Sequence, residues 1–457
     1  MSSSYGAVPD GSVKEEPQEF VKKKRCNDIL FAIAYLAHLA VVITVLIQYS
    51  PEDSEKDFTT GGVYKFVGII ALIAIVLSTL ALGFMSAFAG ALVEIALLSS
   101  LTVTLAVAGY AVYVAKIWMA IIGGVAFLSG CIFTYCVWKK IPFAASNLRT
   151  ALKAIRTNLG LAVMAYLWEA VAFAWTLLWF NSAGAAMNNV GWGIVFLYLL
   201  SFFWTQQLIN NLQHTIVASM IGTWWHNPTD ANSCWDDGLN KALCHSLTYS
   251  FGSICFGSIL ASFVQALKWL HRMANNNDKC SCIAAMIDCC LVCVQEIMEY
   301  FNTWAYTFVG IHGDSYIESG RSVLALFRQR GWNAIINDQL AGAVMWFMTL
   351  SISLLCGLAG WWLVTFDDDI FVGIGIEEDE DDAVGFAAGF LIGYMLSGIM
   401  MELVNSAICA VIVCFAEAPA VFQKNYPTLC SEMLEAWNDA YPDECSDDFD
   451  SLKSPLN

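Results

Sequence analysis

The sequence predicts an all-α, polytopic membrane protein with about ten transmembrane helices and both termini in the cytoplasm. Of its 457 residues, 58% are hydrophobic and 14% are charged. Soluble domains contain roughly 45–50% apolar residues and about 25% charged residues. The apolar runs are about 20 residues long, enough to cross a bilayer, and they lack the two-residue alternation of strands. Because hydrocarbon offers the backbone no water to bond with, runs of this kind must cross as helices.

The spans follow from the apolar runs in chain order. Residues 1–28 are polar and form a predicted cytoplasmic tail, and residues 29–418 form the ten-helix domain. The first span, Ile29 to Gln48, lacks a small-residue cleavage site and is therefore retained. Residues 419–457 form a predicted acidic cytoplasmic tail. The other nine spans are expected at residues 63–85, 87–114, 117–138, 159–180, 191–222, 245–270, 283–311, 336–364 and 384–416.

Basic residues predict the orientation. With a cytoplasmic N-terminus, 16 of the 22 Lys and Arg residues fall in cytoplasmic segments, as the positive-inside rule requires. The acidic stretch from Asp367 to Asp382 then lies outside, where it either concentrates cations or is simply solvated. With few basic residues and a net charge of −18, the chain is not expected to bind nucleic acid.

Several local patterns predict how the helices pack. Gly385, Gly389 and Gly393 form a GxxxGxxxG face for close helix contact. The Phe-Gly-Ser repeats at 251–253 and 256–258 indicate a flexible or locally broken helix. Residues 143–157 are amphipathic and suit a helix lying at the inner membrane interface. Four tryptophans at span ends are interpreted as interfacial belt residues: Trp224, Trp225, Trp361 and Trp362.

Motif searches indicate neither an enzyme nor a cofactor. The sequence has no GxxxxGK[ST], HExxH or GxSxG string, which argues against a primary pump and against common hydrolases. The cysteine cluster lacks paired CxxC spacing and a flanking histidine, so packing or reversible acylation is favoured over zinc. The cluster consists of Cys280, Cys282, Cys289, Cys290 and Cys293.

Polar side chains at membrane depth are the main functional signal, because they are costly there. The sixth span carries two polar faces, with Gln206, Asn210 and His214 on one and Gln207, Asn211 and Thr215 on the next. Hydrogen bonding between helices would explain any one of them. The set favours a pathway lining, with Gln207, Asn211 and His214 as candidate substrate-binding residues. Glu94, Glu169 and Glu402 are isolated intramembrane carboxylates that spacing alone assigns to no site.

The eighth span places a carboxylate beside two aromatic rings. Glu296, Tyr300 and Trp304 recur every four residues and share a helix face. A quaternary ammonium ion cannot donate hydrogen bonds, so ring faces and one anion recognise it, at ~0.5–2 kcal/mol per cation–π contact. The alternative is a helix end emerging into headgroups, where Tyr and Trp are common. The three residues are therefore candidate substrate-binding residues, with that alternative open.

Several strings between residues 160 and 420 occur in a characteristic order. They are the stretch from Phe203 to Trp225, Thr248-Tyr-Ser-Phe-Gly-Ser-Ile-Cys-Phe-Gly-Ser258, Glu299-Tyr-Phe-Asn-Thr-Trp-Ala-Tyr306 with Gly310-Ile-His-Gly313 and Phe327-Arg-Gln-Arg-Gly331, and Cys414-Phe-Ala-Glu-Ala-Pro419. Together they resemble the choline transporter-like family, solute carrier family 44. The resemblance implies a ten-helix plasma-membrane transporter with cytoplasmic termini, choline as substrate and ethanolamine as a second candidate.

The leading hypothesis is a facilitative or secondary carrier for a small organic cation, with choline as the first candidate. One alternative is a channel-like or lipid-handling membrane protein without saturable choline transport. Another is a structural protein whose polar stripes only join helices. Membrane lipid is the other expected partner, and the sequence assigns no oligomeric state, coupling ion or cofactor.

Overall fold

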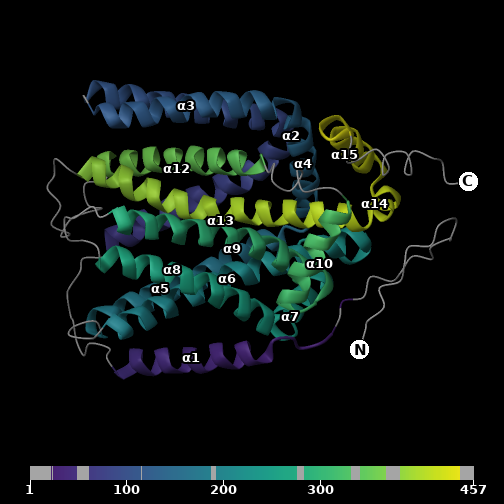
Figure 1. Cartoon of the computed structure of the whole chain (residues 1–457), viewed down its shortest axis with the longest axis horizontal. Coiled ribbons are helices and arrows are strands. Elements are labelled where there is room, and N and C mark those ends of the chain that lie inside the picture. The colour runs from purple at the N-terminus through teal and green to yellow at the C-terminus, as the bar shows by residue number, and fades with distance from the viewer. Residues whose placement is uncertain are drawn as a thin grey trace, which may run out of the picture.

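Long helices packed side by side make up most of the protein in a computed structural model (Figure 1). The structure describes residues 22, 24–48, 61–114, 116–186, 192–274, 282–330, 340–366 and 381–442, and all regular secondary structure within them is helical. The long helices are α1 (Ile29–Gln48), α2 (Gly61–Tyr113), α3 (Ile117–Val137), α5 (Gly160–Ala186), α6 (Trp192–His226), α8 (Phe251–Ala274), α9 (Cys282–His312), α12 (Ala341–Phe366) and α13 (Asp381–Glu417).

Shorter helices gather at one end of the bundle, the right-hand end in Figure 1. They are α4 (Ile141–Thr157), α7 (Asp237–Thr248), α10 (Tyr316–Gln329), α14 (Pro419–Asn425) and α15 (Pro427–Ala440), with single 3₁₀ turns at Trp138–Lys140 and Pro228–Asp230. The start of α1 and the ends of α6, α9 and α13 lie at this end, which we call the terminus-proximal end. The opposite end is the distal end.

Six helical segments within the described residues are long and apolar enough to cross a membrane by themselves. They are Tyr64–Tyr113, Ile117–Thr157, Gly160–Trp179, Phe251–Met273, Ala341–Phe366 and Asp381–Glu417. Helices α6 and α9, which carry the polar residues singled out above, are not among the six. The all-α membrane class is thus confirmed, and every predicted span overlaps a long helix, although the span predicted at 245–270 also includes the end of α7 and the break at Tyr249 and Ser250. The two spans predicted at 63–85 and 87–114 meet at Phe88, whose non-helical backbone (φ −120°, ψ 27°) interrupts α2.

Helix α13 runs through the centre and packs most extensively against α12 (Figure 1). The predicted glycine face forms this contact: Gly385 and Gly389 lie against Gly360, and Gly393 lies against Cys356. Small side chains let the two backbones approach closely, which is the basis of helix association in lipid. The glycine prediction is confirmed.

The amphipathic segment predicted at 143–157 is helix α4, but protein covers its apolar face. Leu148, Leu152 and Ile155 are fully buried, and α4 packs against α2, α13 and α15. The indole of Trp437 in α15 donates a hydrogen bond to the side-chain oxygen of Asn147 at 2.9 Å. The segment from residue 419, predicted as a tail, is therefore helical and docked through Ala440.

Two further expectations are refined or corrected. The helix predicted at 245–270 is broken at Tyr249 and Ser250, between α7 and α8, but α8 itself runs unbroken through both Phe-Gly-Ser repeats. Their glycines instead allow close approach, because a Cβ on Gly252 would lie 2.3 Å from the Asn27 carbonyl oxygen and one on Gly257 would lie 2.2 Å from the Tyr306 hydroxyl.

Trp224 and Trp225 are fully buried and are not belt residues. Trp224 stacks on Tyr426 at 4.3 Å and Trp225 stacks on Phe422 at 4.0 Å, both between ring centroids. Trp361 and Trp362 are 44% and 55% exposed, as interfacial residues should be.

Candidate functional site

His214 joins three helices at a buried polar node. Its Nε2 lies 3.1 Å from the carbonyl oxygen of Thr303 and 2.8 Å from the hydroxyl of Thr307, both on α9. Its Nδ1 lies 2.8 Å from the hydroxyl of Ser406 on α13. A neutral imidazole with its proton on Nε2 satisfies these partners, donating to α9 and accepting from Ser406. The node fixes α6 against α9 and α13.

The other polar residues of α6 divide between neighbouring helices. Asn211 donates from Nδ2 to the Ser258 hydroxyl on α8 at 3.0 Å. Gln206 donates to the Thr176 hydroxyl on α5 at 2.6 Å. Gln207 is half-buried, and Asn210 is exposed. Some residues of the predicted polar stripe therefore join helices, and others are partly or fully exposed.

The structure separates the three candidate residues of α9 by burial. Glu296 is exposed, Tyr300 is 41% exposed and Trp304 is 1% exposed. The Tyr300 and Trp304 rings are in edge contact, with centroids 6.5 Å apart, and Trp304 also packs on Phe327 of α10 at 5.0 Å. The carboxylate and one ring are thus accessible, whereas the second ring is covered by α10.

Burial changes sharply along the three helices that meet at His214. On α9 no residue from 286 to 300 is buried, whereas residues 304–311 all are. On α13 the buried residues between 381 and 398 are Gly385, Gly389, Gly393 and Ser397, all of which contact α12, whereas residues 406–416 are all buried. On α6 residues 214–222 are all buried. The helices are enclosed by protein mainly in their terminus-proximal halves.

Exposed polar groups adjoin the node on its distal side. One helical turn from His214, Thr303 and Ser406 toward the distal end lie Asn210, Glu299 and Glu402 respectively. All three are exposed. The node therefore marks the boundary between the enclosed halves of these helices and their more exposed halves.

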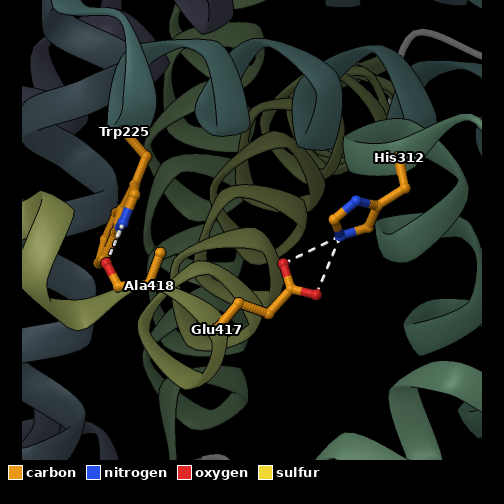
Figure 2. Close-up of polar contacts among 4 residues, drawn as sticks. All are labelled: Trp225, His312, Glu417 and Ala418. Carbon is orange, nitrogen blue, oxygen red and sulfur yellow. Dashed lines mark hydrogen bonds and ion pairs between the residues drawn. The ribbon is translucent and has the colours of Figure 1, made fainter. Parts of the chain in front are cut away.

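A histidine–carboxylate contact joins α9 and α13 at the terminus-proximal end. Figure 2 shows His312 at the end of α9 facing Glu417 at the end of α13, with Nε2 at 2.9 and 3.0 Å from the two carboxylate oxygens. On the other side of α13, the indole of Trp225 donates to the carbonyl oxygen of Ala418 at 3.0 Å (Figure 2). His312 and Glu417 come from two of the strings that carry the family resemblance. Sequence alone did not reveal that these strings meet.

The segment before α1 docks on the same end. The Lys22 side chain donates from Nζ to the carbonyl oxygen of Ser219 on α6 at 3.0 Å and contacts the hydroxyl of the same residue. Asn27 donates from its side chain to the Gly313 carbonyl oxygen at 3.1 Å. The Asp28 carboxylate accepts from the Ser253 hydroxyl at 2.7 Å and from the first backbone N–H of α10, that of Tyr316, at 3.3 Å. The N-terminal segment thus crosses α6, α8 and α10.

Docking of this segment is expected to strengthen as the pH rises. Burial lowers the pKa of Lys22 from 10.5 to about 7. Between these values the undocked lysine is protonated and the docked lysine is not, so docking releases a proton and becomes more favourable with rising pH. Below about pH 7 both states are charged and docking carries its full desolvation cost.

Hydrogen exchange at the backbone amide of Asn27, which donates to Tyr249, measures this docking. After correction for intrinsic rates, protection should be greater at about pH 8.5 than at about pH 6.5, and Lys22→Met should remove the difference. Equal protection at the two pH values in the unmodified protein would contradict the expectation.

The cysteine cluster is not a buried packing element in its described part. Cys289, Cys290 and Cys293 are exposed on α9. Cys280 lies outside the described residues, as does the acidic stretch from Asp367 to Glu380. The expectation of ordinary packing is therefore not met at the three described positions.

A pocket between α12 and α13 combines residues that the sequence did not bring together. It has a volume of about 280 Å³ and is lined by Gly342, Met345, Trp346, Thr349, Gly398, Met401, Glu402 and Asn405. Trp346 and Glu402 lie on antiparallel helices joined through residues 367–380. Glu402 stood out in the sequence as an isolated carboxylate, but nothing there linked it to an indole.

Comparison with known proteins agrees with these motifs. The family model described as plasma-membrane choline transporter matches residues 117–420. A CTL-like protein of Dictyostelium discoideum is 28% identical to this chain, and the match covers 93% of this chain and 76% of the length of that protein. Protein PNS1 of Saccharomyces cerevisiae is 23% identical, and the match covers 96% of this chain and 89% of the length of that protein. The chain belongs to the choline transporter-like family of membrane proteins.

Proposed function

We propose that this protein is a facilitative carrier that moves a small organic cation across the plasma membrane. Choline is the first candidate substrate. The observation that carries the proposal is the polar node at His214, closed on one side and flanked by exposed polar groups on the other. Family membership supports transport as the class of activity, and it weighs against an enzyme.

The proposed topology has ten spans within residues 29–418, counting the two halves of α2 separately, and both termini in the cytoplasm. The terminus-proximal end is then cytoplasmic, in agreement with the distribution of basic residues. In this orientation the closed half faces the cytoplasm. In the proposed carrier, His312, Glu417 and the docked N-terminal segment shut the inner end.

The proposed route runs along α6 and α9. Glu296 and Tyr300 are accessible and meet the cation first, and Trp304 supports the Tyr300 ring from behind. Gln207, Asn211 and His214 line the next part of the path. Release to the cytoplasm then requires the contacts of Lys22 and the His312–Glu417 pair to break, as in carriers that rock helix groups around a central site.

Uptake of labelled choline by proteoliposomes tests this function. A monovalent cation gains ~2.3 kcal/mol per 100 mV of inside-negative potential, so we expect saturable uptake that accelerates when such a potential is imposed. Labelled ethanolamine, offered separately, tests the second substrate. Uptake no faster than in empty vesicles would refute the proposal, and flux without saturation or counterflow would indicate the channel-like alternative.

A further inference from the structure

The pocket between α12 and α13 contains a carboxylate without a positive partner. The Glu402 carboxylate accepts from Nδ2 of Asn405 at 3.5 Å, the limit for a hydrogen bond. None of the ion pairs found among the described residues includes Glu402. Helices α5, α6, α9, α12 and α13 contain no Lys or Arg at all. These five helices therefore supply Glu402 with no lysine or arginine as a counter-ion.

Position makes this unpaired carboxylate costly. Glu402 is the one charged residue of α13 between Asp382 and Glu417, and the side chain is exposed. The exposed residues that precede it on α13 include Leu391, Tyr394 and Met395, which are apolar or aromatic. A carboxylate in such a setting is expected to be paired or functional. A bound cation would provide the missing charge.

The other side chains of the pocket select the kind of cation. Trp346 is 43% exposed and offers an indole face, and Met345 and Met401 supply polarisable thioethers. Thr349 and Asn405 are the remaining polar side chains. A metal ion would require several oxygen or nitrogen ligands, whereas an ammonium with methyl or methylene groups suits one carboxylate and an aromatic ring. The volume of about 280 Å³ is near the lower limit of small-molecule sites, roughly 300 Å³.

We infer that the pocket formed by Glu402, Trp346 and Asn405 binds an organic ammonium group, either free choline or the choline headgroup of a phospholipid. Glu402 supplies the charge and Trp346 the ring face. For free choline the inference rests on the proposed transport function and adds a binding carboxylate on α13 to the residues proposed on α6 and α9. Asn405 is next in sequence to Ser406, which bonds His214, so the pocket adjoins the polar node.

Equilibrium binding of labelled choline to the purified protein in phosphatidylglycerol nanodiscs tests the free-cation source. Glu402→Gln keeps the shape of the side chain and should weaken binding at least about tenfold, equivalent to ~1.4 kcal/mol. Trp346→Leu, the second variant, should also weaken it. Glu94→Gln is the matched control, because Glu94 is an exposed carboxylate of α2 that does not line the pocket.

Retention of headgroup-labelled phosphatidylcholine by the same purified variants tests the lipid source. Loss of choline binding in Glu402→Gln identifies a free-cation site, and loss of lipid retention alone identifies a headgroup site. Wild-type behaviour of both Glu402→Gln and Trp346→Leu in both assays, with monodisperse protein, would overturn the inference. Choline uptake by the wild-type protein tests transport separately. If the wild-type protein transports choline and the pocket variants bind normally, the pocket inference fails but the proposed carrier function stands.

Discussion

Replacing His214 with alanine is expected to reduce choline uptake per folded molecule by about tenfold or more, equivalent to ~1.4 kcal/mol in the transport barrier. The imidazole accepts from Ser406 and contacts Thr303 and Thr307. Alanine leaves the Ser406 hydroxyl, which is fully buried, without this partner, and an unsatisfied buried group costs about 1–3 kcal/mol. Helices α6, α9 and α13 then lose the hydrogen bonds that join them at the boundary of their enclosed halves.

His245→Ala controls for the loss of a buried imidazole in general. His245 lies on α7, is 7% exposed and contacts the Ser250 hydroxyl at 3.3 Å. We expect His245→Ala to lower thermal stability without slowing uptake per folded molecule. Size-exclusion chromatography after heating gives the folded fraction, and proteoliposome uptake gives the rate. Wild-type uptake by folded His214→Ala protein would show that the node is only structural.

Replacing Gly389 with alanine is expected to lower the free energy of unfolding by about 1–3 kcal/mol, as overpacking does in other cores. A Cβ at this position would lie 2.5 Å from the carbonyl oxygen of Cys356 and 3.2 Å from the Cα of Gly360. Both neighbours are backbone atoms, so they cannot rotate away. Relief requires α12 and α13 to move apart along their main contact.

Gly398→Ala is the matched control on the same helix. A Cβ there meets no atom within 4 Å, so the change should not lower the free energy of unfolding and should raise it by up to ~1 kcal/mol through helix propensity. Thermal unfolding of the two variants in the same detergent provides the comparison. Equal melting temperatures for Gly389→Ala and Gly398→Ala would contradict the close α12–α13 contact.

The fold class could be predicted from sequence because lipid leaves the chain few choices. An apolar run such as Ile29 to Gln48 must satisfy its own backbone and is therefore helical. The face formed by Gly385, Gly389 and Gly393 is likewise a property of spacing along one helix. The polar content of α6 was equally visible, since polar residues in an apolar run stand out whatever surrounds them.

Other interpretations failed where the partner of a side chain decides its role. Trp224 and Trp225 occupy a helix end, where belt residues are common, but they stack on Tyr426 and Phe422. The repeated Gly252 and Gly257 suggested a break within the repeats, but the break lies before them, at Tyr249 and Ser250, and the two glycines leave room for neighbouring atoms. In each case the sequence specified the residue and its local geometry, whereas a distant segment determined its surroundings.

The sequence by itself determined that this protein is a helical membrane protein, and its motifs indicated the family. Only the tertiary structure decided which polar groups meet: His214 with Ser406, His312 with Glu417, and Glu402 with the pocket that contains Trp346. The physical reason is that hydrophobicity and helical periodicity act along one segment. Which helix faces which depends on contacts between residues far apart in the sequence, such as His312 and Glu417, which are 105 residues apart.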